Sequence, residues 1–233
     1  MICVLSPAKT MVAADAVTTS LKPKSVPILL QKAQVLVEKI KAMTTAQLKK
    51  LCEVSDNLIT HVKTIYDNTI IVDSKMTVAQ CENDKSRFNQ AGLMFDGPAF
   101  KGLDAASFSN DQAINAQNHL RILCGLYGVV KPGDFIQEYR LCMGSKLAVE
   151  AHKDLYSYWG DDIANEIIDD LQRQLDVLEK ETKSRPKALL VNVASQEYFK
   201  VVQRSIPADV KVIECIFRDA GTIKTAYAKV SLL

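Results

Sequence analysis

Short apolar runs that end in polar residues are the feature that most constrains this sequence, because such runs are typical of strands buried within a sheet. Ile2–Leu5 is one such run, and it stops at Ser6 and Pro7. Residues 188–193 form a second, followed by a polar group around Ser195. Stretches between the two runs place apolar residues every three or four positions, the pattern of helices. Strands interleaved with helices predict an α/β or mixed α+β fold, with a central mixed sheet flanked by helices.

Polar residues after the predicted strands are candidates for a site. Ser6, Lys9 and Thr10 lie at the carboxyl end of the first strand, where open α/β sheets bind ligands. An ordinary polar turn is the alternative interpretation. Ser195 repeats the pattern after the later strand and is placed to cap a short helix that carries Tyr198.

Other elements follow from spacing and capping residues. Residues 44–47 form a capping box that predicts a helix start. Residues 155–178 keep helical spacing across Gly160, which predicts one long helix or two consecutive ones. Residues 93–95 predict a strand, and residues 210–217 and 222–230 predict two final strands joined as a hairpin. Residues 69–92 are not assigned to one element: 69–72 look like a strand, whereas 81–92 are polar and could be helix or loop.

Length and composition favour a single large domain, since the chain has 233 residues and is 48% hydrophobic. The net charge of +2 is too small to indicate or exclude a polyanionic partner. The six cysteines contain no Cys-x-x-Cys pair, which predicts reduced thiols in a reducing compartment. We expect Cys3, Cys124 and Cys215 to be buried and slow to react, because apolar residues flank each of them.

The sequence predicts a protein of the cytoplasm or nucleus. The apolar run Ile2–Leu5 has no basic flank and is too short for a signal peptide, and no later stretch could cross a bilayer. Zinc-protease, P-loop and nucleophile-elbow motifs are absent, and only three histidines occur. We therefore expect no cofactor, no metal and no assigned catalytic residue.

The region from residue 109 to residue 143 is the most informative part of the chain. Ser109 and Gln112 form a capping box, and apolar spacing predicts a helix that continues through Leu123. Arg121 then falls on the exposed side of this helix. Gly125 would end the helix in a left-handed conformation, which glycine adopts without a steric penalty.

Gly128 allows a second turn, so residues 125–128 predict a tight hairpin around Tyr127. Such a hairpin can bring backbone N–H groups close to a phosphate, with Arg121, Lys131 and Arg140 available to balance the charge. This chemistry suits contact with nucleic acid independent of sequence. Two ordinary turn glycines are the alternative, since Gly-x-x-Gly is a weak signal.

Many separate motifs occur in an order that makes the chain similar to the YaaA peroxide-stress family. The resemblance runs from residue 1 to about residue 229. The motifs are Ser6-Pro7-Ala8-Lys9-Thr10, Ala99-Phe100-Lys101-Gly102, His119-Leu120-Arg121, Gly125-Leu126-Tyr127-Gly128, Tyr139-Arg140-Leu141, Met143-Gly144, Asp154-Leu155-Tyr156, Tyr158-Trp159-Gly160 and Asn192-x-Ala194-Ser195-x-Glu197-Tyr198-Phe199-Lys200.

The resemblance implies one domain with a positively charged cleft and a helix-hairpin-helix-like element. It also implies binding of duplex DNA without strong sequence preference, and protection against hydrogen peroxide linked to limiting free iron. Carried over by position, the hairpin is residues 120–128. The cleft candidates are Ser6, Lys9, Lys101, Arg121, Arg140 and Lys200.

Two departures from the family touch this expected surface. After Lys101-Gly102 the family usually has a Val-Tyr-x-Gly segment before the Leu-Asp-Ala found here at residues 103–105. The family also continues into a basic helix, whereas this chain ends at Leu233. We therefore expect a C-terminally shortened single domain over residues 1–233, with weaker DNA affinity and self-association through its final predicted strand.

A second hypothesis is an enzyme that acts on a nucleotide or nucleobase in the same cleft. Lys9, Ser195 and Tyr198 would then supply polar groups at the strand ends. A protein-interaction module has no supporting feature. The expected partners are thus duplex DNA and, in the alternative, a small nucleotide, with no membrane association.

Overall fold

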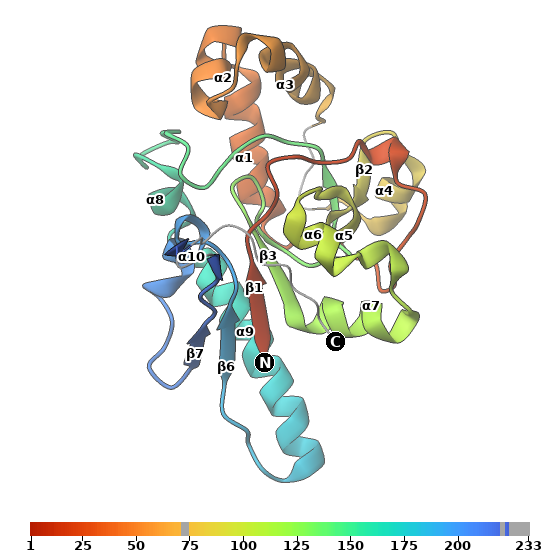
Figure 1. Ribbon diagram of the computed structural model, residues 1–233, viewed down its shortest axis with the longest axis vertical. Helices are drawn as coiled ribbons and strands as arrows, with labels where there is room; N and C mark the ends of the chain where they lie inside the picture. The colour runs from red at the N-terminus through yellow and green to blue at the C-terminus, as the bar shows by residue number, and fades with distance from the viewer. Residues whose placement is uncertain (71–74, 220–221, 224–233) are drawn as a thin grey trace.

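A five-stranded mixed sheet forms the centre of the protein in a computed structural model that describes residues 1–70, 75–219 and 222–223 (Figure 1). The strand order is β4-β3-β1-β6-β7. β1 (Ile2–Leu5), β3 (Leu120–Cys124), β6 (Leu189–Asn192) and β7 (Lys211–Glu214) are parallel, and β4 (Gly128–Val130) runs antiparallel to β3. The predicted mixed sheet flanked by helices is therefore confirmed.

β1 lies in the middle of this sheet because its residues can be buried on both faces. Cys3 pairs with Leu120 on one side and with Val191 on the other. Ile2 and Val4 are fully buried, as expected for a parallel strand covered on both faces. The carboxyl ends of β1 and β6 therefore open at the same edge of the sheet.

Ten α-helices and four further short strands complete the described part of the chain. In Figure 1, α2 and α3 lie at the top, and α9 runs along the sheet to the bottom. The helices are α1 (Leu30–Lys41), α2 (Thr45–Cys52), α3 (Asp56–Asn68), α4 (Val78–Asn83), α5 (Ala91–Met94), α6 (Pro98–Leu103), α7 (Asn110–His119), α8 (Leu155–Trp159), α9 (Asp162–Thr182) and α10 (Gln196–Gln203), with 3-10 turns at Ala14–Ala16 and Ala105–Ser107. β2 (Phe88–Gln90) pairs with β5 (Phe135–Gln137), and β8 (Arg218–Asp219) pairs with β9 (Thr222–Ile223).

Capping residues located several helix starts correctly. Thr44 with Gln47 and Ser109 with Gln112 both form the predicted capping boxes. The two-helix interpretation of residues 155–178 is also confirmed, because Gly160 separates α8 from α9 with a positive φ of 54°. None of the helices in the described ranges is long and apolar enough to cross a membrane.

The predicted helix over residues 109–123 is wrong beyond His119, because Leu120–Cys124 is strand β3. All five residues of β3 are buried, and its backbone pairs with β1 and β4. A short, mostly apolar run fits a helical stripe and a buried strand equally well, so pairing with β1 decides the outcome. Residues 120–130 therefore form a helix-to-strand junction and a β-hairpin instead of a helix-hairpin-helix.

Other expectations also need correction. Leu93 and Met94 lie in helix α5, so the strand predicted at residues 93–95 is wrong. The strand predicted at residues 210–217 is shorter and pairs in parallel with β6, because its apolar residues continue the central sheet. β8 and β9, on either side of the predicted turn, pair antiparallel. Most of the last predicted strand, and residues 71–72 of another, lie outside the described residues.

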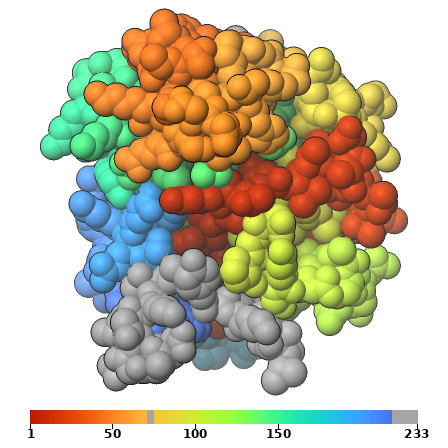
Figure 2. Space-filling model, turned by 45° about the horizontal axis from the view of Figure 1, so that its top comes forward, coloured from red at the N-terminus to blue at the C-terminus, as the bar shows by residue number. Residues whose placement is uncertain are grey.

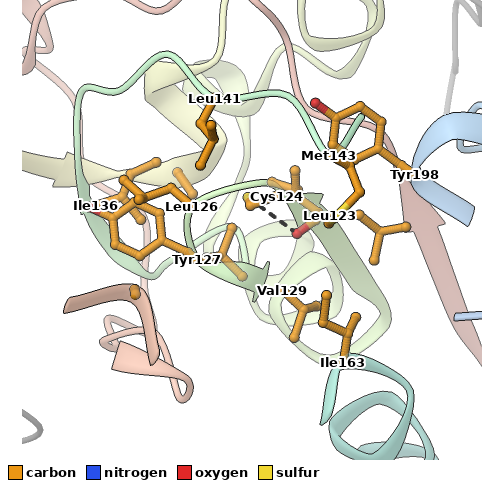
Figure 3. Packing of buried hydrophobic residues seen from close by; sticks show 14 of the residues in the cluster. Leu123, Cys124, Leu126, Tyr127, Val129, Ile136, Leu141, Met143, Ile163 and Tyr198 are labelled. Carbon is orange, nitrogen blue, oxygen red and sulfur yellow. Dashed lines mark hydrogen bonds between the residues drawn. The ribbon is translucent and has the colours of Figure 1, made fainter. Parts of the chain in front are cut away.

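The β3–β4 hairpin is part of the hydrophobic core (Figure 3). Leu123, Leu126 and Tyr127 are buried, and Val129 lies beside Ile163 of α9. The two hairpin glycines fit where a side chain would not. A Cβ atom on Gly125 would come within 2.4 Å of the Leu141 carbonyl oxygen. Gly128 has a φ of +71°, and a Cβ atom on it would lie 3.0 Å from the Trp159 side chain.

Candidate functional site

A crevice opens where the chain leaves β1 and β6 in opposite directions. From β1 the chain reaches its next strand of this sheet, β3, on one side, and from β6 it passes through α10 to β7 on the other. Connections that diverge from neighbouring parallel strands leave space at their carboxyl ends, the usual ligand position in open α/β sheets. The fold thus places a candidate site between residues 6–10 and residues 193–198.

A cavity of about 630 Å³ occupies this position, and we call it the strand-end pocket. In Figure 2 the red N-terminal segment lies between the blue segment of α10 and the yellow-green segment of α6, the three parts of the chain that line the pocket. Its lining residues are Leu5, Ser6, Pro7, Ala8, Lys9, Thr10, Asp96, Gly97, Pro98, Ala99, Phe100, Val193, Ser195, Gln196, Glu197 and Tyr198.

Two serines tie the walls of the strand-end pocket together. The Ser195 amide donates to Ser6 Oγ at 2.8 Å, and Ser6 Oγ lies 3.2 Å from Ser195 Oγ. Ser195 precedes α10 but makes no side-chain cap bond, because its hydroxyl is turned toward Ser6. The amides of Gln196 and Glu197 donate to no acceptor within the described part of the chain. Both residues line the pocket, so first-turn N–H groups are available there.

Three cations lie in or next to the lining of the strand-end pocket, and we call the part of the pocket beside them its mouth. Lys9 belongs to its lining, and Arg140 NH1 donates to the Lys9 carbonyl oxygen at 2.8 Å. Arg140 Nε is buried and has no hydrogen-bond partner among the described residues. Lys101 Nζ lies 3.3 Å from the lining residue Asp96, with 72% of its side chain exposed. Ser6 and Lys9 thus line the pocket, and Lys101 and Arg140 each contact one of its lining residues.

Lys200 lies one turn further along α10, outside the strand-end pocket. Its Nζ is 5.0 Å from the centre of the Tyr156 ring. With Gln203 and Arg204, these two residues line a smaller cavity of about 250 Å³. Tyr156 connects the two cavities, because its hydroxyl donates to the Glu197 carbonyl oxygen at 3.0 Å.

Two carboxylates keep the strand-end pocket from being uniformly positive. Asp96 faces Lys101, and Glu197 Oε1 accepts the Gly144 amide at 2.9 Å. Sequence reasoning did not select these two acids, although Asp96 begins a Gly-Pro turn and Glu197 follows the capping serine. Tyr198 adds a neutral hydroxyl, since burial raises its pKa well above the usual value for a phenol.

Arg121 and Lys131 lie elsewhere, around another cavity of about 370 Å³ beside β4 and α9. The prediction that Arg121 is exposed is wrong, because β3 buries it to 3% exposure. Its Nε and NH2 contact Asp170 Oδ2 at 2.8 and 2.6 Å, and its NH1 donates to the Gln117 and Leu120 carbonyl oxygens. Lys131 also contacts Asp170, at 3.1 Å.

Gly125, Tyr127 and Gly128 are also remote from solvent. All three are buried, and the Tyr127 hydroxyl accepts the Gln137 amide at 3.0 Å. Burial of this backbone favours the alternative interpretation of turn glycines that allow close packing. The hairpin amides are therefore not open to a phosphate on the surface.

The cysteines match the prediction in part. Burial raises the pKa of Cys124 to about 12, and Cys3 is half-buried with a pKa raised to about 11. The prediction for Cys215 is wrong, because it follows the exposed edge strand β7 and is itself exposed. Within the described residues, no three His, Cys, Asp or Glu side chains are grouped so that they could hold a metal ion.

Comparison with known proteins identifies a family. The family model for the peroxide stress protein YaaA matches residues 1–231. UPF0246 proteins of Cupriavidus metallidurans and Ralstonia pickettii are both 38% identical, over 220 and 219 residues. One of Clostridium botulinum is 35% identical over 221 residues. Each match covers 94% of this chain and 76% of the relative. The resemblance in the sequence motifs is thus confirmed, and the chain belongs to the peroxide stress protein YaaA family.

Proposed function

We propose that this chain acts in the response to peroxide stress by binding duplex DNA, without strong sequence preference, at the mouth of the strand-end pocket. The observation that carries the proposal is the grouping of Lys9, Lys101 and Arg140 at one edge of the sheet. Cations of this kind attract the phosphate backbone of DNA independently of its sequence. Bound protein would shield DNA from oxidative, iron-linked damage in the cytoplasm.

The proposed surface differs from the hairpin surface expected from the sequence. Arg121 and Lys131 are engaged with Asp170, and the glycine hairpin is buried. Lys9 and Lys101 remain exposed, and Arg140 is half-buried, with its NH1 on the Lys9 carbonyl oxygen. The proposal therefore depends on the three cations at the mouth, with Lys200 as a neighbouring contact.

A salt titration tests this function. Anisotropy of a labelled blunt duplex should show affinity falling with salt, with a log-log slope of about −0.9 for each phosphate contacted. Lys9→Ala and Lys101→Ala should each make the slope shallower by roughly one unit. Lys180→Ala is the matched control, because Lys180 lies in the last turn of α9, which ends at the bottom of Figure 1, far from the carboxyl end of β1. Absence of duplex binding at low salt would refute the proposal.

An enzyme acting on a nucleotide or nucleobase is the second candidate, because the strand-end pocket is concave and holds two hydroxyls in contact. However, no histidine, lysine or carboxylate of the described residues hydrogen-bonds either serine to activate it as a nucleophile. Binding is therefore better supported than catalysis. Incubation with a panel of mononucleotides, followed by product analysis, would reveal any turnover.

A further inference from the structure

The volume of the strand-end pocket sets the size of what can enter it. Its 630 Å³ lies within the range of small-molecule sites, roughly 300–1,000 Å³. A DNA duplex carries its phosphates on the outside of a broad stacked helix and cannot enter such a space. One nucleotide that has left the stack can. If DNA lies on the mouth, the pocket beneath it can hold a single unpaired base.

The distribution of charge fixes which end of a nucleotide would face inward. Lys9 and Lys101 are exposed, whereas the lining carboxylates Asp96 and Glu197 are half-buried. A phosphate group deep in the pocket would be repelled by these two carboxylates. A phosphate at the mouth would instead meet the cations. The favoured orientation therefore has the backbone outside and the base inside.

Hydrogen-bonding capacity in the pocket matches a base that carries an amino group. Glu197 uses Oε1 for the Gly144 amide, and Asp96 uses Oδ1 for Lys101. The second oxygen of each carboxylate has no donor among the residues that the structure describes. A carboxylate accepts well from the exocyclic amino group of cytosine, and adenine has such a group too. Thymine lacks it.

Apolar lining suits the faces of a base. Ala8, Pro98, Ala99 and Phe100 form this part of the wall, on the loop after β1 and on α6. Burial of base faces against apolar and aromatic groups stabilises single-stranded nucleic acid by about 1–3 kcal/mol for each base. The pocket thus combines an apolar wall, acceptors inside and cations at its mouth.

We propose that the strand-end pocket receives one unpaired, amino-bearing nucleotide of the bound DNA, with the base inside and the flanking phosphates on Lys9, Lys101 and Arg140. This inference rests on the proposed DNA binding and adds a preference for DNA with an overhang, gap or unpaired base. Sequence preference would then exist at a single unpaired position and nowhere in the duplex.

Anisotropy titrations of three otherwise identical duplexes test the inference on the unmodified protein. One duplex is blunt, one has a three-nucleotide cytosine overhang, and one has a three-nucleotide thymine overhang. The cytosine overhang should bind at least about fivefold tighter than the blunt duplex, and at least about fivefold tighter than the thymine overhang. Equal affinity for all three would overturn the inference while leaving duplex binding intact. Failure of every duplex to bind would refute the proposed function as well.

Two variants in which leucine replaces alanine test whether the preference for the cytosine overhang arises in the strand-end pocket. Ala99→Leu adds volume at the lining, and it should bring the cytosine overhang to within about twofold of the blunt duplex. Ala106→Leu adds the same volume at an exposed position outside the pocket and should leave the preference unchanged. Circular dichroism establishes that both variants fold. Persistence of the preference in folded Ala99→Leu would show that the base binds elsewhere, which contradicts the inference.

Discussion

The guanidinium of Arg121 joins three elements, since it contacts Asp170 of α9 and the carbonyl oxygens of Gln117 in α7 and Leu120 in β3. Sequence spacing placed this residue on an exposed helix face, because the apolar stripe of the predicted helix left Arg121 on the opposite side. Only the partner on α9, 49 residues away, makes its burial possible. No local pattern in the sequence reveals such a distant partner.

We expect Arg121→Ala to destabilise the protein by about 3–5 kcal/mol, because removal of one member of a buried ion pair leaves the other charge poorly compensated. Urea unfolding followed by circular dichroism measures the change. Arg173→Ala is the control: Arg173 contacts the same Asp170 but is 61% exposed, so its loss should cost less than about 1 kcal/mol. Similar losses in the two variants would argue against a structural role specific to Arg121.

The same cluster predicts a dependence of stability on pH. Burial by itself would raise the pKa of Asp170. The neighbouring Arg121, Arg173 and Lys131 outweigh this effect, so the pKa of Asp170 lies below its ordinary value of 3.8. A carboxyl group with a depressed folded pKa stabilises the protein above pH 3.8, and this stabilisation is lost as the pH falls through the folded pKa. Wild-type protein should therefore lose more stability than Asp170→Asn between pH 5 and pH 2. Urea titrations at several pH values measure the free energy of unfolding of both proteins. An equal loss in the two between pH 5 and pH 2 would contradict a stabilising role of the Asp170 carboxylate.

Thiol reactivity should separate the cysteines by burial. Cys215 is exposed, so we expect an aromatic disulfide reagent to modify it first. Cys124 should react only on unfolding, because burial excludes the reagent and raises the thiol pKa to about 12. Mass spectrometry of timed digests measures the order. Rapid modification of Cys124 in folded protein would mean that the core opens readily.

At the scale of elements, capping boxes and strand-end polar groups were the reliable signals. The Ser109 and Thr44 boxes located α7 and α2, and the polar residues after β1 and β6 located the strand-end pocket. These signals are local, because a cap bonds to its own helix and a strand end needs only its own loop. The boundary between α7 and β3 was missed, since it depends on pairing with β1.

The β3–β4 hairpin should not tolerate a side chain at Gly128. Its φ of +71° disfavours other residues by about 1–2 kcal/mol, and an added Cβ atom would meet Leu29 and Trp159 at 3.0 Å. Gly128→Ala should therefore lower the free energy of unfolding by about 2 kcal/mol or more. Gly102→Ala within α6 should instead be neutral or stabilising, by up to about 1 kcal/mol. Equal effects in thermal unfolding would show that the hairpin backbone can relax.

At the scale of the whole molecule, the sheet joins segments from both ends of the described chain. β1 is paired on both sides, whereas among the described residues β7 is paired only with β6. Amides of β1 should therefore exchange with solvent only through global unfolding, and those of β7 through smaller openings. Hydrogen exchange with mass spectrometry should show at least about tenfold slower exchange in β1. Faster exchange in β1 than in β7 would mean that the sheet opens from its centre.

The contact between Ser6 and Ser195 in the strand-end pocket has a consequence for folding during translation. Ser6 and Ser195 are 189 residues apart, and β3 and β6, the neighbours of β1, are also distant in sequence. Translation at roughly 5–20 residues per second separates β1 from β6 by on the order of 10–40 s. During that interval the apolar β1 segment has no neighbour on its β6 side, while α1, α2 and α3 can already pack through local contacts. The first strand to be synthesised thus waits for β6 before it is paired on both sides, and we expect the nascent chain to need protection of that segment until Ser195 has emerged.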